Sequence, residues 1–325
     1  MPPKKTQPTG RTPRLPDDLI LEAAWLYYYE DRNQSEIAET LGVSRSSIVG
    51  YLQQARERDI VEVRLDPKSF ARHRYARTLQ ERYGLADVQI APGDTFSLER
   101  AALLAARCLP DLLEPGDTLG VAWGQTVFTL SEHVTRRAVP DLTVVQMVGA
   151  VNSPYGFDSE SCASRIAAAF GGRCVNLHVP AIVSSAAMAE ALQRESVIAA
   201  QLCELDHINK ALFAVGSCEI DSHIVTSGIA GPEDLADYRA RGAVGLICSR
   251  FIDKAGNHLP GRLDERMIGL TPDKIRGLST GILVSSGAEK IVGMAAALQG
   301  GYATHLFTDL PTAAGIVELG NAATS

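Results

Sequence analysis

The sequence contains few cysteines, and none is spaced as a metal ligand would be. Six cysteines occur among 325 residues, no CxxC pair is present, and no histidine lies near a cysteine at metal-ligand spacing. Disulfide-stabilised domains and zinc modules depend on such spacings. We therefore expect buried, reduced thiols, and we expect neither a metal ion nor a cofactor.

Long apolar runs are also missing. No apolar segment approaches the ~18 residues of a membrane-spanning helix, and no basic segment precedes an apolar one as in a signal peptide. The sequence therefore predicts a soluble, cytoplasmic protein.

Positive charge is scarce. The net charge is −7, and residues 1–64 carry nine Lys and Arg against ten Asp and Glu. This balance argues against a non-specific coat on nucleic acid. It does not exclude sequence-specific binding, which depends on local charge. We expect modest DNA affinity from one copy of such a segment and a need for more than one copy.

Recognised catalytic signatures are absent as well. The sequence has no G-x-S-x-G, H-x-x-E-H, P-loop or complete G-x-G-x-x-G motif. Six histidines are scattered along the chain and are not spaced as a catalytic triad or a metal site requires: His133, His178, His207, His223, His258 and His305. No nucleophile has a base beside it, so the sequence predicts no catalytic residue.

What the chain does contain is a helix-turn-helix pattern at residues 34–51. Ile37, Ala38 and Leu41 share one face of a first short helix, and Ile48 lies on the inner face of a second. Gly42 between them supplies the positive φ that a sharp turn requires. N-x-x-E from Asn33 predicts a capping box, and Ser44 is placed to cap the second helix.

Short polar side chains and one guanidinium cover the outside of this unit. Such groups read base edges and phosphates when a helix lies in the major groove. An ordinary helical hairpin with a polar surface is the alternative. The predicted DNA-contacting residues are Gln34, Ser35, Ser44, Arg45, Ser46, Ser47 and Gln54.

Composition divides the chain into three parts. Residues 1–14 hold four prolines and no apolar period, which predicts a disordered arm. Residues 15–65 form the predicted DNA-binding domain, with a first helix at 15–29 and a short strand or wing at 60–65. Asp66-Pro67 marks the boundary, a further helix spans 68–83, and residues 66–325 form the second domain.

The second domain alternates short apolar runs with helical segments. This pattern predicts a doubly wound, mostly parallel sheet in an α/β fold. The predicted strands are 86–91, 118–123, 143–148, 174–178, 211–215, 244–248, 281–285 and 304–307. The predicted helices are 98–109, 126–137, 160–170, 186–204, 233–240, 289–299 and 312–319.

Ligands of such sheets bind where strands end and helices begin. The candidate loops at such positions span residues 124–126, 149–152, 216–219, 249–257 and 285–290. Lys290 stands in the first turn of a helix, where a cation is locally unfavourable, so it is easier to explain beside an anion or an acid such as Asp253. A solvated lysine and a simple Thr126 helix cap are the alternatives.

The combination of the N-terminal motif with WGQT, FIDKAGN and GAEKIVGMAAALQGGYATHLFTDLPTAAGIVEL resembles the SorC/DeoR-type sugar-responsive transcriptional regulators of bacteria. The resemblance extends from about residue 15 to 320. It implies a second domain that is similar in fold to ribose-phosphate isomerases and glucosamine-phosphate deaminases, but that binds its sugar without turning it over. In that family the effector is contacted by the W-G-x-T loop, by an aspartate and by a lysine at the start of a helix. The resemblance implies the same role here for Gly124–Thr126, Asp253 and Lys290.

We therefore expect a sugar, polyol or sugar phosphate to alter operator binding in a dimer or tetramer, and we expect the operator to be an imperfect inverted repeat. The predicted effector-binding residues are Gly124, Gln125, Thr126, Asn152, Asp253, Gly287, Glu289 and Lys290. Two other readings remain open at this point. One is a sugar-phosphate isomerase or deaminase with an accessory head, and the other is a protein–protein adaptor.

Overall fold

The computed structural model describes residues 16–63, 67–151, 153–154 and 156–322. The chain divides into two compact units, residues 1–69 and 70–325, here called the head and the large unit. The predicted arm at 1–14 and the predicted boundary between residues 65 and 66 lie outside the described residues and stay predictions. Within the described ranges, no helix combines the length and apolar character needed to cross a lipid bilayer.

Three helices form the head: α1 (Pro16–Tyr28), α2 (Gln34–Leu41) and α3 (Arg45–Glu57). Ile37 and Ile48 are completely buried in the core that these helices share. Gly42 ends α2 with φ of 69°, as the turn requires. Asn33 and Glu36 form the predicted capping box, and Ser44 Oγ accepts a hydrogen bond from the backbone of Ser47 at 3.1 Å.

The predicted wing is not found in the part of residues 60–65 that is described. Residues 60–63 form no strand. The backbone N–H groups of Ile60 and Val61 donate to the carbonyl of Ala55, at 2.9 and 3.2 Å. The chain after α3 therefore folds back on the end of that helix, which uses the backbone groups a strand would need for pairing.

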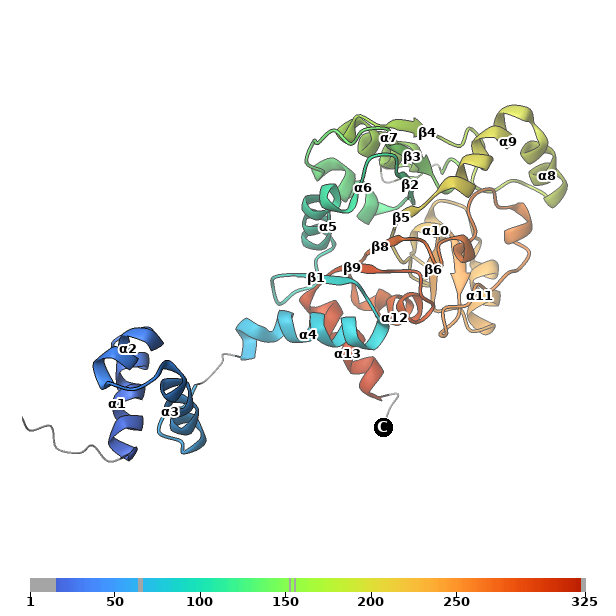
Figure 1. The fold of residues 1–325 in the computed structure, drawn as a ribbon. Coiled ribbons are helices and arrows are strands. Elements are labelled where there is room, and N and C mark those ends of the chain that lie inside the picture. The colour runs from blue at the N-terminus through green and yellow to red at the C-terminus, as the bar shows by residue number, and fades with distance from the viewer. Residues whose placement is uncertain (1–15, 64–66, 152, 155, 323–325) are drawn as a thin grey trace, which may run out of the picture. The chain divides into compact units, whose positions relative to one another are not determined.

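The large unit is built on a seven-stranded parallel sheet (Figure 1) with the order β1-β9-β8-β5-β2-β3-β4. Its strands are β1 (Asp87–Ala91), β2 (Thr118–Val121), β3 (Thr143–Gln146), β4 (Arg173–Val175), β5 (Lys210–Phe213), β8 (Thr280–Val284) and β9 (His305–Asp309). Every residue of the central strands β5 and β8 is buried, which explains why these runs lack polar alternation. The predicted α/β fold with a doubly wound parallel sheet is confirmed.

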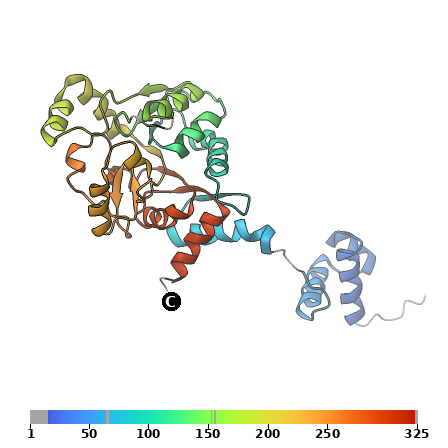
Figure 2. The same cartoon turned by 180° about the vertical axis from the view of Figure 1, so that it is seen from behind.

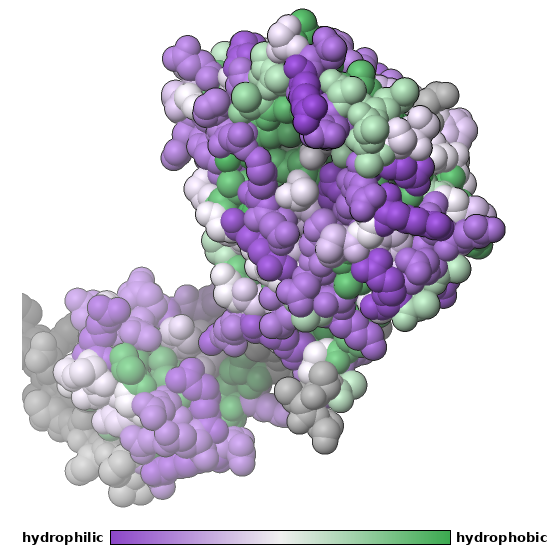
Figure 3. Space-filling model, turned by 90° about the vertical axis from the view of Figure 1, so that its right-hand side faces the viewer, coloured by the Kyte–Doolittle hydropathy of each residue, from purple (hydrophilic) through white to green (hydrophobic). Residues whose placement is uncertain are grey.

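Helices cover both faces of this sheet (Figures 1 and 2) and enclose two apolar cores. One core is covered by α5 (Leu98–Cys108), α6 (Gln125–His133) and α7 (Ser159–Phe170). The other includes residues of α4 (Pro67–Tyr83), α8 (Ala186–Arg194), α9 (Ser196–Cys203), α10 (His223–Thr226), α11 (Pro232–Ala240), α12 (Ile291–Gln299) and α13 (Leu310–Ala322). In Figure 3, hydrophilic residues predominate on the face that is drawn, as expected when the apolar sides of helices face a sheet.

The described residues of the large unit also form five short 3₁₀ segments: η1 (Leu109–Leu112), η2 (Glu204–His207), η3 (Asp264–Arg266), η4 (Pro272–Lys274) and η5 (Ala288–Lys290). The predicted helix at 186–204 is interrupted at Glu195, whose backbone is extended with ψ of 131°. This break separates α8 from α9.

The predicted strand at 244–248 does not join the main sheet, which corrects the sequence-based assignment. Its central part forms β6 (Gly245–Ile247), which pairs antiparallel with β7 (Arg250–Ile252) in a separate two-stranded sheet. Cys248 and Ser249 connect the two strands with φ of 50° and 63°. Two consecutive residues with positive φ form the tight turn that matches the twist of a hairpin, so the chain reverses here instead of crossing over.

Candidate functional site

A cavity of about 480 Å³ opens at the carboxyl end of the parallel sheet. The chain runs from β2 outward through β3 to β4, and then returns to β5 on the other side of β2. The loops after β2 and β5 therefore diverge and leave a crevice, which is the usual ligand site of open α/β sheets. The residues that line the cavity come from segments 96–98, 122–126, 214–224, 246–249 and 286–290.

Two helical segments begin at this cavity in the same way. Gly124 precedes α6 with φ of 129° and ψ of 164°, and Gly287 precedes η5 and α12 with φ of 134° and ψ of 144°. Only glycine adopts this backbone region readily. Neither start has a side-chain cap, so the first backbone N–H groups of α6 and of η5 remain available to a ligand.

Lys290 and His223 are the basic residues of the cavity lining, which also includes the acidic residues Asp221 and Glu289. Lys290 lines the cavity, is partly buried, and makes no ion pair with any described residue. Burial lowers the pKa of its ammonium group, and the neighbouring Glu289 opposes that shift. Burial also lowers the pKa of His223, and the charge of Lys290 lowers it further. Two groups that disfavour each other's charge form a site that a bound anion would stabilise.

Asp309, at the end of β9, holds three segments around the cavity in place. Its carboxylate is fully buried and accepts hydrogen bonds from Ser97 N, from Ser286 Oγ at 2.5 Å and from Thr312 N at 3.0 Å. Burial acts to raise the pKa of Asp309, but these hydrogen bonds together lower it below its usual value. An ionised Asp309 therefore ties the loops after β1 and β8 to the start of α13.

The rings of Trp123 and His223 line the cavity, and Phe157 contacts both of them. Trp123 Nε1 donates a hydrogen bond to Ser249 Oγ at 2.9 Å, which joins the loop after β2 to the turn of the β6–β7 hairpin. Phe157 packs against Trp123 and meets the ring of His223 edge-on, with ring centroids 5.4 Å apart. Cys248 and Ser249, the residues with positive φ, both line the cavity.

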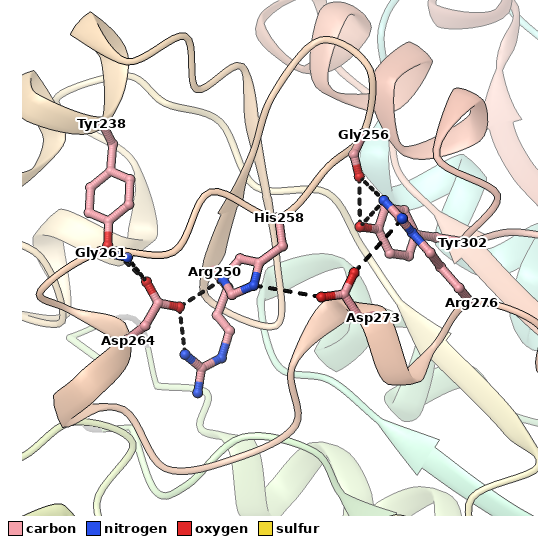
Figure 4. Close-up of polar contacts among 9 residues, drawn as sticks. All are labelled: Tyr238, Arg250, Gly256, His258, Gly261, Asp264, Asp273, Arg276 and Tyr302. Atoms are coloured by element: carbon pink, nitrogen blue, oxygen red, sulfur yellow. Dashed lines mark hydrogen bonds and ion pairs between the residues drawn. The ribbon is translucent and has the colours of Figure 1, made fainter.

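A buried polar network fixes the hairpin from behind (Figure 4). The carboxylate of Asp264 pairs with Arg250 at 2.6 Å and accepts a hydrogen bond from Tyr238 Oη at 2.9 Å. His258 Nε2 lies 2.8 Å from the same carboxylate. Burial acts to raise the pKa of Asp264, but hydrogen bonds from His258, Arg250 and Tyr238 hold it well below its usual range. Arg250 directly follows Ser249, so this network anchors the turn at the cavity.

The structure brings six of the eight predicted effector-binding residues together. Gly124, Gln125, Thr126, Gly287, Glu289 and Lys290 all line the cavity. Asn152 lies outside the described residues. The remaining residue, Asp253, is not part of the cavity lining.

Asp253 lies outside because the segment before it is a hairpin. β7 leads away from the turn at Cys248 and Ser249, and Asp253 follows the far end of that strand. Its carboxylate accepts hydrogen bonds from the backbone of Ala255 at 2.9 Å and of Asn257 at 2.8 Å. The carboxylate therefore stabilises its own loop, and the suggested pairing of Asp253 with Lys290 is not found.

Two groups of lining residues are not among the predicted effector-binding residues. Phe96, Ser97 and Leu98 follow β1, so they also belong to a loop after a strand of the sheet. The other group, Asp221, Ser222 and His223, lies at the start of the short helix α10. This group lies several residues beyond the end of β5, although Asp221 and Ser222 come shortly after the candidate loop at 216–219.

The predicted DNA-contacting residues lie on the head. Arg45 and Ser46 are exposed at the start of α3, and Ser44 caps that helix. Gln54 is partly buried and accepts a hydrogen bond from Arg58 at 3.3 Å. The others are exposed or partly buried: Gln34, Ser35 and Ser47.

Three further residues share the outer side of α3 with Ser46: Val49, Gly50 and Gln53. Val49 is 46% exposed, and a Cβ at Gly50 would meet nothing within 4 Å. Glycine inside a helix costs about 1 kcal/mol relative to alanine. An outward-facing glycine in this position lets the helix backbone approach another surface closely.

Comparisons with known proteins agree with this architecture. The family model described as "Putative sugar-binding domain" matches residues 69–318. The chain is 36% identical over 306 residues to an uncharacterized transcriptional regulator of Escherichia coli K12, covering 91% of this chain and 93% of the relative. It is 30% identical over 312 residues to the deoxyribonucleoside regulator of Bacillus subtilis, covering 94% and 98% of the two chains.

A solved structure matches across both units. The crystal structure of the full-length sorbitol operon regulator of Klebsiella pneumoniae has a TM-score of 0.70 to this chain at 26% identity. The match covers 92% of this chain and 98% of that one. The likeness therefore includes the head as well as the large unit.

Proposed function

Because this chain belongs to the SorC/DeoR-type family of sugar-binding transcriptional regulators, we propose a specific effector site and a mode of operator binding for it. The chain is a sugar-responsive regulator and not an enzyme, since its curated relatives and its structural neighbour are regulators. The effector site is the cavity at the junction of β2 and β5.

The effector is a phosphorylated sugar or polyol. The observation that carries this proposal is the convergence on one cavity of two uncapped helical starts and Lys290, which has no ion pair among the described residues. Backbone N–H groups at helix starts and a lysine ammonium are the groups with which proteins bind phosphate. Lys290 is partly buried, and a phosphate would compensate its charge whereas a neutral sugar would not, so a phosphate fits the cavity better.

The regulator binds its operator with the heads of at least two subunits. Each α3 enters a major groove, and Ser44, Arg45 and Ser46 lie where such a helix meets the DNA. Residues 1–64 carry no excess of positive charge, so one head supplies little electrostatic affinity. Two heads related by a two-fold axis require an imperfect inverted repeat.

The effector acts by favouring one arrangement of the subunits. To move a DNA-competent state from dominant to rare, it needs about 5.5 kcal/mol of differential affinity for the two states. Hydrogen bonds to charged groups contribute about 1.5–3 kcal/mol each. A few bonds from a phosphate to the starts of α6 and η5 and to Lys290 are therefore sufficient.

The test is a thermal-shift screen of the full chain. The compounds are D-glucitol, D-ribose, D-glucitol 6-phosphate, D-ribose 5-phosphate and inorganic phosphate. A ligand at a hundredfold excess over its dissociation constant stabilises the folded state by about 2.7 kcal/mol. We expect a phosphorylated compound to stabilise the protein and its free counterpart to do so much less.

Lys290→Ala should weaken binding of that compound roughly tenfold to a hundredfold, because one charge-assisted interaction is lost. Lys254→Ala is the matched control, since Lys254 is exposed and lies outside the cavity lining. If free and phosphorylated sugars stabilise the protein equally, and Lys290→Ala does not change this stabilisation, the effector is not recognised through a phosphate.

A further inference from the structure

We propose that the hydroxyl of Ser222 recognises a hydroxyl of the effector and so selects among ligands of the same charge. This inference rests on the proposed function, because it assigns a second subsite to the same cavity. The residue lines the cavity and is 9% exposed, and its Oγ has no hydrogen-bond partner.

The other serines of the cavity show how unusual this is. Five serines line it, and four of them have partners. Ser286 donates to Asp309, and Ser249 accepts from Trp123. Ser97 accepts from Arg100 N at 3.2 Å, and Ser217 accepts from Glu219 N at 3.5 Å. Among these five serines only Ser222 keeps its hydroxyl unpaired; the other buried hydroxyl without a partner in the described residues, that of Thr308, lies outside the cavity lining.

Ser222 also lacks the helix-capping hydrogen bond that a serine in its position usually makes. It is the N-cap residue of α10, and its side chain makes no capping hydrogen bond. Ser44, Ser97 and Ser185 occupy the same position in α3, α5 and α8, and each accepts a hydrogen bond from the third backbone N–H of its helix. A buried serine hydroxyl that makes no hydrogen bond destabilises the folded protein unless a ligand supplies the missing partner.

The position of Ser222 fits a polyhydroxylated anion. The next residue, His223, is close enough to Lys290 for the ammonium charge to affect the His223 pKa. Ser222 and Lys290 therefore belong to neighbouring parts of the same cavity lining. A sugar or polyol phosphate that places its phosphate at Lys290 presents hydroxyls to the segment that holds Ser222. Ser222 selects by whether one of those hydroxyls can pair with it.

The first experiment needs no ligand. An unpaired buried hydroxyl destabilises the unliganded protein, so Ser222→Ala should raise the melting temperature of the full chain by about 2–4 °C. Ser185→Ala is the matched control, because Ser185 caps α8 with a bond of 3.2 Å and lies outside the cavity lining. Loss of that cap should lower the melting temperature by a similar amount.

The second experiment compares D-ribose 5-phosphate, 2-deoxy-D-ribose 5-phosphate and D-glucitol 6-phosphate on both variants. Any of these that stabilises the wild type through Ser222 should bind Ser222→Ala about fivefold to tenfold more weakly. The same compound should bind Ser185→Ala with unchanged affinity. The deoxy compound should lose nothing on Ser222→Ala if the 2-hydroxyl is the group that Ser222 pairs with.

Two results overturn the inference: a melting temperature that Ser222→Ala leaves unchanged or lowers, or a ligand affinity that this variant fully retains for every compound. If none of the three compounds stabilises the wild type, that result counts against the proposed effector class. The melting temperature of unliganded Ser222→Ala then decides on Ser222 separately.

Discussion

At the scale of single residues, the cavity combines groups whose protonation depends on one another. His223 has a pKa below its ordinary value of 6.5, because it is buried and because Lys290 is charged. A phosphate beside both residues would favour the protonated imidazole and raise that pKa. Binding of an anion therefore takes up protons, and this proton uptake can be measured.

We expect affinity for a phosphorylated effector to rise as the pH falls through the pKa of His223 in the bound protein towards its lower pKa in the free protein. Calorimetric titrations in buffers of different ionisation enthalpy would report up to one proton taken up per site. His223→Gln should abolish the uptake and flatten the pH profile. A wild-type profile that is already flat would exclude His223 from the phosphate site.

At the scale of elements, the β6–β7 hairpin brings a strained turn to the cavity and a buried ion pair behind it. Non-glycine residues with positive φ, here Cys248 and Ser249, cost about 1–3 kcal/mol each and persist only where the surroundings fix them. The side chains of Arg250 and Asp264 are only 6% and 14% exposed. The ion pair of Arg250 with Asp264 holds the turn in this conformation, and Trp123 connects the turn to the loop after β2.

Arg250→Met should destabilise the large unit by about 3–5 kcal/mol, because it leaves the Asp264 carboxylate buried without its cation. Urea denaturation measures this loss. Arg262→Met is the matched control: Arg262 pairs with Asp234 at 3.0 Å but is 65% exposed, so its loss should cost at most about 1 kcal/mol. Equal losses in the two variants would show that burial does not decide the contribution of the pair.

The same pair predicts a pH dependence of stability. The pKa of Asp264 is lowered on folding. Ionised Asp264 therefore makes its full contribution to the free energy of unfolding above about pH 3.9, the pKa of the carboxyl group in the unfolded chain. That contribution is lost as the pH falls through the lower pKa of Asp264 in the folded protein. The difference in unfolding free energy between the wild type and Arg250→Met should accordingly stay constant between about pH 5 and 7.

At the scale of the whole molecule, operator binding depends on how many heads act together. If two heads bind half-sites on one face of DNA, inserting about 5 base pairs between the half-sites turns them to opposite faces, and about 10 base pairs restores the original facing. We expect the 5-base-pair insertion to abolish binding by the full chain and the 10-base-pair insertion to restore part of it. Fluorescence anisotropy at a fixed salt concentration measures both.

The isolated head, residues 1–69, should bind each operator much more weakly and should not distinguish the two spacings. A full chain that binds both spaced operators equally well would contradict the proposal that two heads bind as a unit.

The sequence alone determined what depends on local periodicity and on turn chemistry. The helix-turn-helix follows from apolar spacing, from Gly42 and from the caps at Asn33 and Ser44, all within about twenty residues. The parallel sheet follows from short apolar runs between helices. Its polarity places the ends of β2 and β8 on one edge, so Gly124–Thr126 and Gly287–Lys290 could be expected to converge.

Tertiary structure alone decided the rest, because it depends on contacts that no local pattern encodes. An apolar run at residues 244–248 suits a buried sheet strand or a hairpin equally well, and only the turn at Cys248 and Ser249 selects the hairpin. That choice removed Asp253 from the cavity. The unpaired hydroxyl of Ser222 exists only because residues far apart in the sequence bury it without offering it a partner.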